Sequence, residues 1–156
     1  MVKDISLFNG EIEHKIVTGN SHHIRQKMRR MPLRFEKEEK THVQQLLDKG
    51  VIEPSSSEWV SSPVLVRKKD GKLRYCIDFR KLNNVTDKDV YLIFNKETCL
   101  DTLRGAVSTL DMVTGYYQVK LNGHHKHKTA FVTKYCLYKY MKLPFGLCNS
   151  PQLLVE

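Results

Sequence analysis

The spacing of apolar residues predicts one clear helix near the middle of the first half of the chain. Over residues 35–49 the pattern has helical periodicity, and Gly50 stands where a helix commonly ends. Three glutamates in the first turn suit the helix dipole. The apolar residues that would share the buried face of this helix are Phe35, Val43, Leu46 and Leu47.

Strand-like runs follow the helix and predict antiparallel pairing. Residues 64–69 and 73–79 flank Asp70-Gly71, a pair of residues that favours a β-hairpin. Two more strands are expected at 129–133 and 138–143, joined by a turn near Cys136. A loop is expected at 54–57, a tight turn or short helix at 115–118, an exposed histidine loop at 122–127, and helices at 97–104 and from 149 onward. The pattern indicates an α+β fold.

The N-terminal part of the chain has a different character. Residues 1–20 show little periodicity and are expected to form an arm. Residues 22–34 are basic and interrupted by Pro32, which predicts an extended segment lying on a surface or on a polyanion.

Charge adds a candidate partner to this picture. The net charge is +9, from 26 Lys and Arg against 17 Asp and Glu, which suggests a polyanionic partner, most simply nucleic acid. A solvated basic surface is the alternative. Cations gather around the predicted hairpin, at Arg67, Lys68, Lys69, Lys72 and Arg74.

The cysteines argue against a structural metal site and against secretion. All four are far apart, and the seven histidines do not join them at zinc-ligand spacing. No stretch has the length of a membrane span or of a signal core. We expect an intracellular protein, cytoplasmic or nuclear, that does not enter a membrane.

Asp111 is the sharpest candidate for chemistry. It ends a short apolar run, Val107 to Leu110, and a turn with small residues follows it. A carboxylate in such a place can hold a hard cation such as Mg²⁺. An aspartate that caps the following turn is the alternative interpretation.

Several segments together resemble reverse transcriptases, in the form found in gypsy-type LTR retrotransposons. These segments are LRYCIDFRKLN (73–83), STLDM (108–112) with GYYQ (115–118), HKTAF (127–131) and LPFGLCNSP (143–151). They occur in the order and spacing of that family, over roughly residues 12–151. The resemblance implies a polymerase-type fold with an arm or linker at 1–34, a fingers subdomain at 35–106 and a partial palm subdomain at 107–156.

The resemblance also implies roles for single residues. Asp111 would be the first metal-binding aspartate of the palm, with Mg²⁺ as cofactor. Tyr116 would lie under the sugar and exclude ribonucleotides, although a core aromatic is the alternative. Arg74 would contact the triphosphate of the incoming deoxynucleotide, together with one of Arg67, Lys68 or Lys69, of which we favour Lys68. The pocket floor would be Phe145 and Gly146, for which a plain turn is the alternative, and the contacts to an RNA or DNA template-primer would include Arg67, Lys69 and Lys72.

One part of the family's catalytic site is missing from this sequence. In the family, the first aspartate is joined by an adjacent Asp pair on a later hairpin, whereas here the only acid after Asp111 is Glu156. Two-metal phosphoryl transfer needs several converging carboxylates. We therefore expect a truncated reverse-transcriptase domain, whose family reaction adds deoxynucleotides to a primer 3′ end, but which is inactive alone. The alternatives are a non-catalytic remnant that binds nucleic acid through its basic hairpin, and a fragment that does not fold stably.

Overall fold

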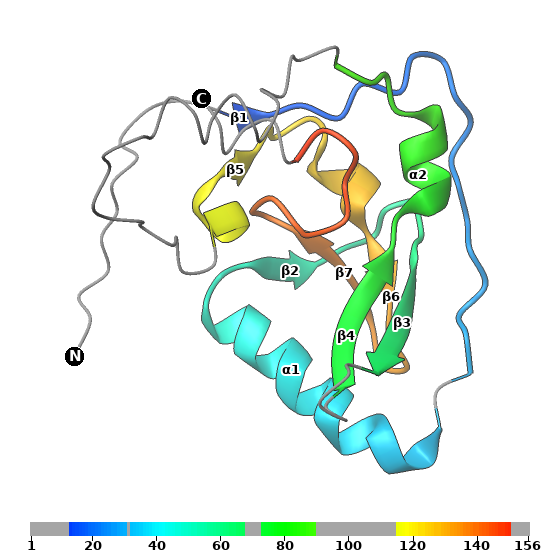
Figure 1. Cartoon of the computed structure of the whole chain (residues 1–156), viewed down its shortest axis with the longest axis vertical. Coiled ribbons are helices and arrows are strands. Elements are labelled where there is room, and N and C mark those ends of the chain that lie inside the picture. The colour runs from blue at the N-terminus through cyan, green and yellow to red at the C-terminus, as the bar shows by residue number, and fades with distance from the viewer. Residues whose placement is uncertain (1–12, 31, 68–72, 90–114, 151–156) are drawn as a thin grey trace, which may run out of the picture.

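The computed structural model describes residues 13–30, 32–67, 73–89 and 115–150 of the chain (Figure 1). The helices expected at 97–104 and from 149 onward, and the run before Asp111, lie wholly or mainly outside these residues. The helical elements are η1 (Leu33–Phe35), α1 (Glu36–Asp48), α2 (Arg80–Val85), η2 (Gly115–Gln118) and η3 (Lys126–Thr129). The strands are β1 (Glu13–His14), β2 (Ile52–Pro54), β3 (Ser62–Arg67), β4 (Leu73–Asp78), β5 (Lys120–Leu121), β6 (Phe131–Val132) and β7 (Leu137–Tyr140).

Helix α1 confirms the clearest prediction, and Gly50 ends it as expected. Gly50 has a φ of 61°, in the left-handed region that glycine adopts without steric cost. Its N–H donates to the Leu47 carbonyl and the Val51 N–H donates to the Leu46 carbonyl, both at 2.9 Å. These two bonds are the Schellman pattern of a helix end, and they turn the chain directly into β2.

Strand β2 is not among the predicted elements, and the loop expected at 54–57 overlaps it only at Pro54. It pairs with β7, so that Ile52 lies opposite Tyr140 and Pro54 opposite Tyr138. Three residues are too few to show a period-two pattern, and their partner strand is far away along the chain. A local pattern could therefore not reveal this strand.

The sheets confirm the α+β class and the antiparallel pairing. Strands β2, β7 and β6 form one antiparallel sheet, and β3 and β4 form the expected hairpin, paired from Ser62↔Asp78 to Arg67↔Leu73. Strand β6 is shorter than the run predicted at 129–133, because Thr129 belongs to η3. The domain boundaries inferred from the resemblance stay a prediction.

The N-terminal segment is partly built into the fold. His14, Ile16 and Thr18 are buried, and β1 lies parallel to β5. The Ile16 N–H donates to His125 Nδ1 at 3.1 Å, and Lys128 Nζ donates to the Ile16 carbonyl at 2.7 Å. His125 is therefore half-buried, contrary to the exposed histidine loop predicted for it, because its ring holds the segment that passes over it.

One hydrophobic core joins these elements. It extends from α1 through the sheets to the loop after β7, and α1 runs beside the sheets at the edge of the molecule (Figure 1). No helix in the described parts of the chain has both the length and the apolar character needed to cross a membrane. The largest fully buried hydrophobic side chains are Phe79, Phe131, Ile16, Leu82, Leu121 and Leu143.

Candidate functional site

An aromatic cluster forms where η2 meets the loop that follows β7. The rings of Tyr116 and Phe145 meet edge to face, with 4.7 Å between centroids and an interplanar angle of 79°. Tyr117 meets the same Phe145 ring at 5.6 Å and 77°. Phe145 remains 53% exposed, which is unusual for a large aromatic residue whose two neighbours are half-buried. The cluster therefore presents an aromatic surface to whatever lies above it.

The loop that carries Phe145 is held by a side chain from α2. Asn83 Nδ2 donates to the Gly146 carbonyl at 2.8 Å, and the Cys148 N–H donates to Asn83 Oδ1 at 3.1 Å. Gly146 has a φ of 95°, so an L side chain here would be strained, and a Cβ would lie 3.8 Å from the Phe79 ring. Asn83 thus fixes the backbone on both sides of residue 147.

A second asparagine, Asn149, holds the end of the same loop through hydrogen bonds. Asn149 is buried, and its Nδ2 donates to the Asp87 carbonyl at 2.9 Å and to Asp89 Oδ2 at 3.2 Å. From the sequence, a helix is expected from residue 149 onward, and Asn83 has no predicted role. Both lie within segments that carry the family resemblance, which is the one signal in the sequence that could have marked them.

Arg74 lies on β4 with its side chain exposed, opposite Val66 of β3. Side chains alternate along a strand, so Arg74 shares a face of β4 with Cys76 and not with Tyr75. Cys76 lies close enough to Tyr117 for its charge to help burial raise the pKa of the Tyr117 hydroxyl. Arg74 is therefore an exposed cation on the same face of β4 as Cys76.

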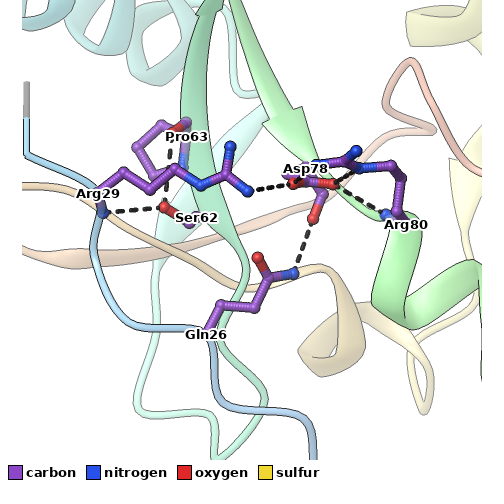
Figure 2. A network of polar contacts seen from close by, with 6 residues as sticks. All are labelled: Gln26, Arg29, Ser62, Pro63, Asp78 and Arg80. Carbon is purple, nitrogen blue, oxygen red and sulfur yellow. Dashed lines mark hydrogen bonds and ion pairs between the residues drawn. The ribbon is translucent and has the colours of Figure 1, made fainter.

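The opposite end of β4 holds a network of charges, shown in Figure 2. Asp78 accepts hydrogen bonds from the Arg80 guanidinium at 2.7 and 2.8 Å and from Arg29 at 2.8 Å. The bonds from Arg80, assisted by the charge of Arg29, lower the pKa of Asp78 to about 2. Asp78 is thus an ionised carboxylate that holds the side chains of Arg29 and Arg80 together.

Several predicted site residues lie outside the residues that the structure describes. Only the backbone of Arg67 is described, as the last residue of β3. Among the described residues, no three His, Cys, Asp or Glu side chains are grouped so as to hold a metal ion. The predicted residues that lie outside the described ranges are Lys68, Lys69, Lys72 and Asp111.

The structure therefore brings together three of the residues singled out from the sequence, Tyr116, Phe145 and Gly146. A fourth, Arg74, is an exposed residue of β4. Such an arrangement can offer a flat aromatic surface, a backbone turn free of side-chain bulk and a guanidinium suited to phosphate oxygens.

Comparisons with known proteins bear directly on this arrangement. A family model described as "Reverse transcriptase (RNA-dependent DNA polymerase)" matches residues 66–155. The retrovirus-related Pol polyprotein from transposon 297 of Drosophila melanogaster is 34% identical over 151 residues, which is 92% of this chain and 14% of that protein. The corresponding polyprotein from transposon gypsy is 38% identical over 119 residues, covering 71% of this chain and 12% of that protein.

Solved structures agree on the fold. The native prototype foamy virus protease-reverse transcriptase superposes with a TM-score of 0.78 at 25% identity, covering 92% of this chain and 20% of that one. The foamy viral protease-reverse transcriptase in complex with an RNA/DNA hybrid gives the same TM-score at 23% identity, over 92% of this chain and 20% of that one. The chain spans about one seventh of the curated relatives' length, and within that span it belongs to the reverse transcriptase family of gypsy-type retroelement Pol proteins.

Proposed function

We propose that this chain supplies the part of a reverse transcriptase domain that receives the incoming deoxynucleoside triphosphate beside a template-primer. The observation that carries the proposal is the contact between Tyr116 and Phe145, which lie 29 positions apart and meet at 4.7 Å in one exposed aromatic cluster. A plain core aromatic pair would be buried on both sides, whereas Phe145 is 53% exposed.

Each residue has a role in this proposal. Tyr116 lies under the sugar and excludes a 2′-hydroxyl, and Phe145 with Gly146 forms the floor. Arg74, together with Lys68, contacts the triphosphate, because a guanidinium forms charge-assisted bonds with phosphate oxygens. Mg²⁺ belongs to the proposal through Asp111, whose carboxylate is a ligand that Mg²⁺ prefers.

A nucleic-acid partner is supported by charge and by the relatives. The chain carries a net charge of +9, and the foamy viral relatives have been solved with double-stranded DNA and with an RNA/DNA hybrid. We propose that the hairpin cations, including Arg67, Lys69 and Lys72, contact the backbone of the template-primer.

Nucleotide binding by the purified chain, with a primer-template present, tests the pocket. We expect a deoxynucleoside triphosphate to bind more tightly than the matching ribonucleoside triphosphate in equilibrium dialysis. Arg74→Gln should weaken binding by roughly ten- to a hundredfold, the loss of one charge-assisted hydrogen bond of about 1.5–3 kcal/mol. Tyr116→Ala should reduce the preference for the deoxy sugar. The charge-matched control is Lys49→Gln, at the C-terminal end of α1. Equal nucleotide binding by the wild type and Arg74→Gln would refute the proposed role of Arg74 in the nucleotide pocket.

Binding without catalysis is the second candidate for the chain on its own. The observation that favours it is the carboxylate count, since Asp111 is followed by no acid except Glu156 and two-metal transfer needs several carboxylates. We expect no primer extension by the purified chain with Mg²⁺ or Mn²⁺. Robust incorporation would show that other carboxylates complete the site.

A further inference from the structure

Residues 24–30, here named the basic strap, form an extended segment fixed to residues 60–62, at the start of β3 and just before it. The Gln26 N–H donates to the Val60 carbonyl and the Val60 N–H donates to the Ile24 carbonyl, both at 2.8 Å. Farther along, the Arg29 N–H donates to Ser62 Oγ at 3.1 Å. Figure 1 shows this segment in blue, running past α2 and down the side of the β3–β4 hairpin.

Side chains anchor the basic strap a second time, at the end of β4. Gln26 Nε2 donates to the Asp78 carbonyl at 2.9 Å, and the Arg29 guanidinium reaches the Asp78 carboxylate at 2.8 Å, as Figure 2 shows. The same carboxylate, only 7% exposed, also holds Arg80 of α2. The strap and the start of α2 are therefore held together by one buried acid.

Two cations of the basic strap take no part in holding it. Lys27 and Arg30 are exposed, and within the described parts of the chain neither forms a hydrogen bond or ion pair. Arg29 and Arg80 keep 50% and 77% of their side chains exposed while bound to Asp78. With the exposed Arg25 and Lys81, the strap and the start of α2 carry six cations against one carboxylate, Asp78. Residues 14–34 include six Lys or Arg and no acid.

Such a surface suits a chain of phosphates. The strand from Lys27 to Arg30 spans about 10 Å when extended, a length over which one strand of a duplex carries about three phosphates. The strap's backbone is already ordered, so that binding costs mainly side-chain entropy. Guanidinium groups held by a carboxylate keep their remaining N–H donors fixed in direction, which favours phosphate oxygens.

We propose that the basic strap, with Arg80 and Lys81, binds the sugar–phosphate backbone of a nucleic-acid strand. The proposal rests on the nucleic-acid binding proposed above and adds a contact surface separate from the hairpin tip. Lys27 and Arg30 are its free cations, and Arg29 and Arg80 are the ordered ones.

The test uses the whole chain and a fluorescein-labelled RNA/DNA hybrid, followed by fluorescence anisotropy at several salt concentrations. The double variant Lys27→Gln/Arg30→Gln removes two cations that form no hydrogen bond or ion pair in the described ranges of the chain. The control Lys40→Gln/Lys49→Gln removes two exposed cations of α1 and changes the net charge equally. We expect the strap variant to bind at least tenfold more weakly, with a salt slope reduced by about 1.4–1.8, and the control to change affinity less than twofold.

Other outcomes separate the two proposals. If the wild type binds the hybrid but the strap variant matches it, or if both double variants lose affinity equally, the strap proposal is wrong and nucleic-acid binding stands. If the wild type binds no hybrid, both proposals are wrong. Competition by polyglutamate as effective as competition by unlabelled hybrid would overturn the assignment to phosphates.

A second measurement does not depend on variants. Acetylation of lysine amines in the wild type, with and without bound hybrid, should show at least fivefold protection of Lys27 and none of Lys40. Equal reactivity of Lys27 in both states would overturn the proposal.

Discussion

Asp78→Asn is the most informative test of how the N-terminal segment is held. The Asp78 side chain is 7% exposed and accepts hydrogen bonds from two guanidinium groups, Arg29 and Arg80, at 2.7–2.8 Å. Asparagine preserves the shape and one acceptor oxygen but removes the charge. The variant therefore measures the value of the charge in this network.

The magnitude follows from the pKa of the carboxyl group. Arg80, helped by Arg29, lowers the pKa of Asp78 from 3.8 to about 2, a difference worth about 2.4 kcal/mol at 1.36 kcal/mol per unit. The two arginine side chains are 50% and 77% exposed, so water screens part of this interaction. We expect a loss of about 1–2 kcal/mol in the free energy of unfolding at pH 7.

The pH dependence has a definite sign. The folded state binds the Asp78 proton more weakly than the unfolded state does, so the contribution is fully present above the unfolded pKa of 3.8. It is lost as the pH falls through the folded pKa of about 2, and roughly half of it remains at pH 3. The wild type and the variant should therefore converge in acid.

Urea unfolding at pH 7 and pH 3 gives the measurement. Trp59 is the single tryptophan and is 4% exposed, so its fluorescence reports unfolding near the basic strap. Asp87→Asn is the matched control, because the Asp87 carboxylate is exposed and makes no contact in the described parts of the chain. The reasoning would be refuted if the free energies of unfolding of the wild type and Asp78→Asn differed by less than about 0.5 kcal/mol at pH 7, or if this difference grew as the pH fell.

Three other contacts give smaller tests. Asn83→Ala removes both bonds to the Phe145 loop and should cost about 1–3 kcal/mol, with faster labelling of the half-buried Cys148 thiol. Burial, with nearby cations, lowers the pKa of His125, whose neutral ring accepts the Ile16 N–H. The Ile16 amide should be fully protected from hydrogen exchange above pH 6.5, the usual pKa of histidine. This protection should fall as the pH passes below the lowered pKa of His125 in the folded state. Gly50→Ala should cost about 1 kcal/mol in thermal unfolding, because φ is 61° and no atom lies near the new Cβ.

Each of these tests has a neighbouring control in the same chain. Asn84→Ala, next along α2, should leave thiol labelling unchanged, and equal labelling in the two asparagine variants would contradict the role of Asn83. His124→Gln should keep the pH dependence at Ile16, whereas a pH-independent wild type would contradict the histidine contact. Gly123, where a Cβ meets open space and φ is ordinary, should accept alanine freely. If Gly50→Ala is as stable as Gly123→Ala, the left-handed backbone conformation at the end of α1 does not explain why glycine occupies position 50.

Local patterns in the sequence were enough for much of the candidate site. Helical spacing and a terminal glycine predicted α1, and the Asp-Gly pair predicted the β3–β4 hairpin, because both depend on residues a few positions apart. The order of family motifs marked Tyr116, Phe145 and Gly146, and the structure places the rings of Tyr116 and Phe145 in contact. Their roles toward a nucleotide, and that of Asp111, stay predictions.

Tertiary structure decided what holds these pieces in place. Residues 13–18 are expected from the sequence to form an arm, yet His14, Ile16 and Thr18 are buried. Ile16 is also bonded to a loop more than 100 positions away, through His125 and Lys128. The two bonds of Asn83 and the pairing of β2 with β7 also join distant parts of the chain. The sequence by itself determined the family, the α+β class and the elements with a strong local signal. The anchoring of the basic strap and of the Phe145 loop was settled by hydrogen bonds between distant residues, which leave no periodic pattern in the chain.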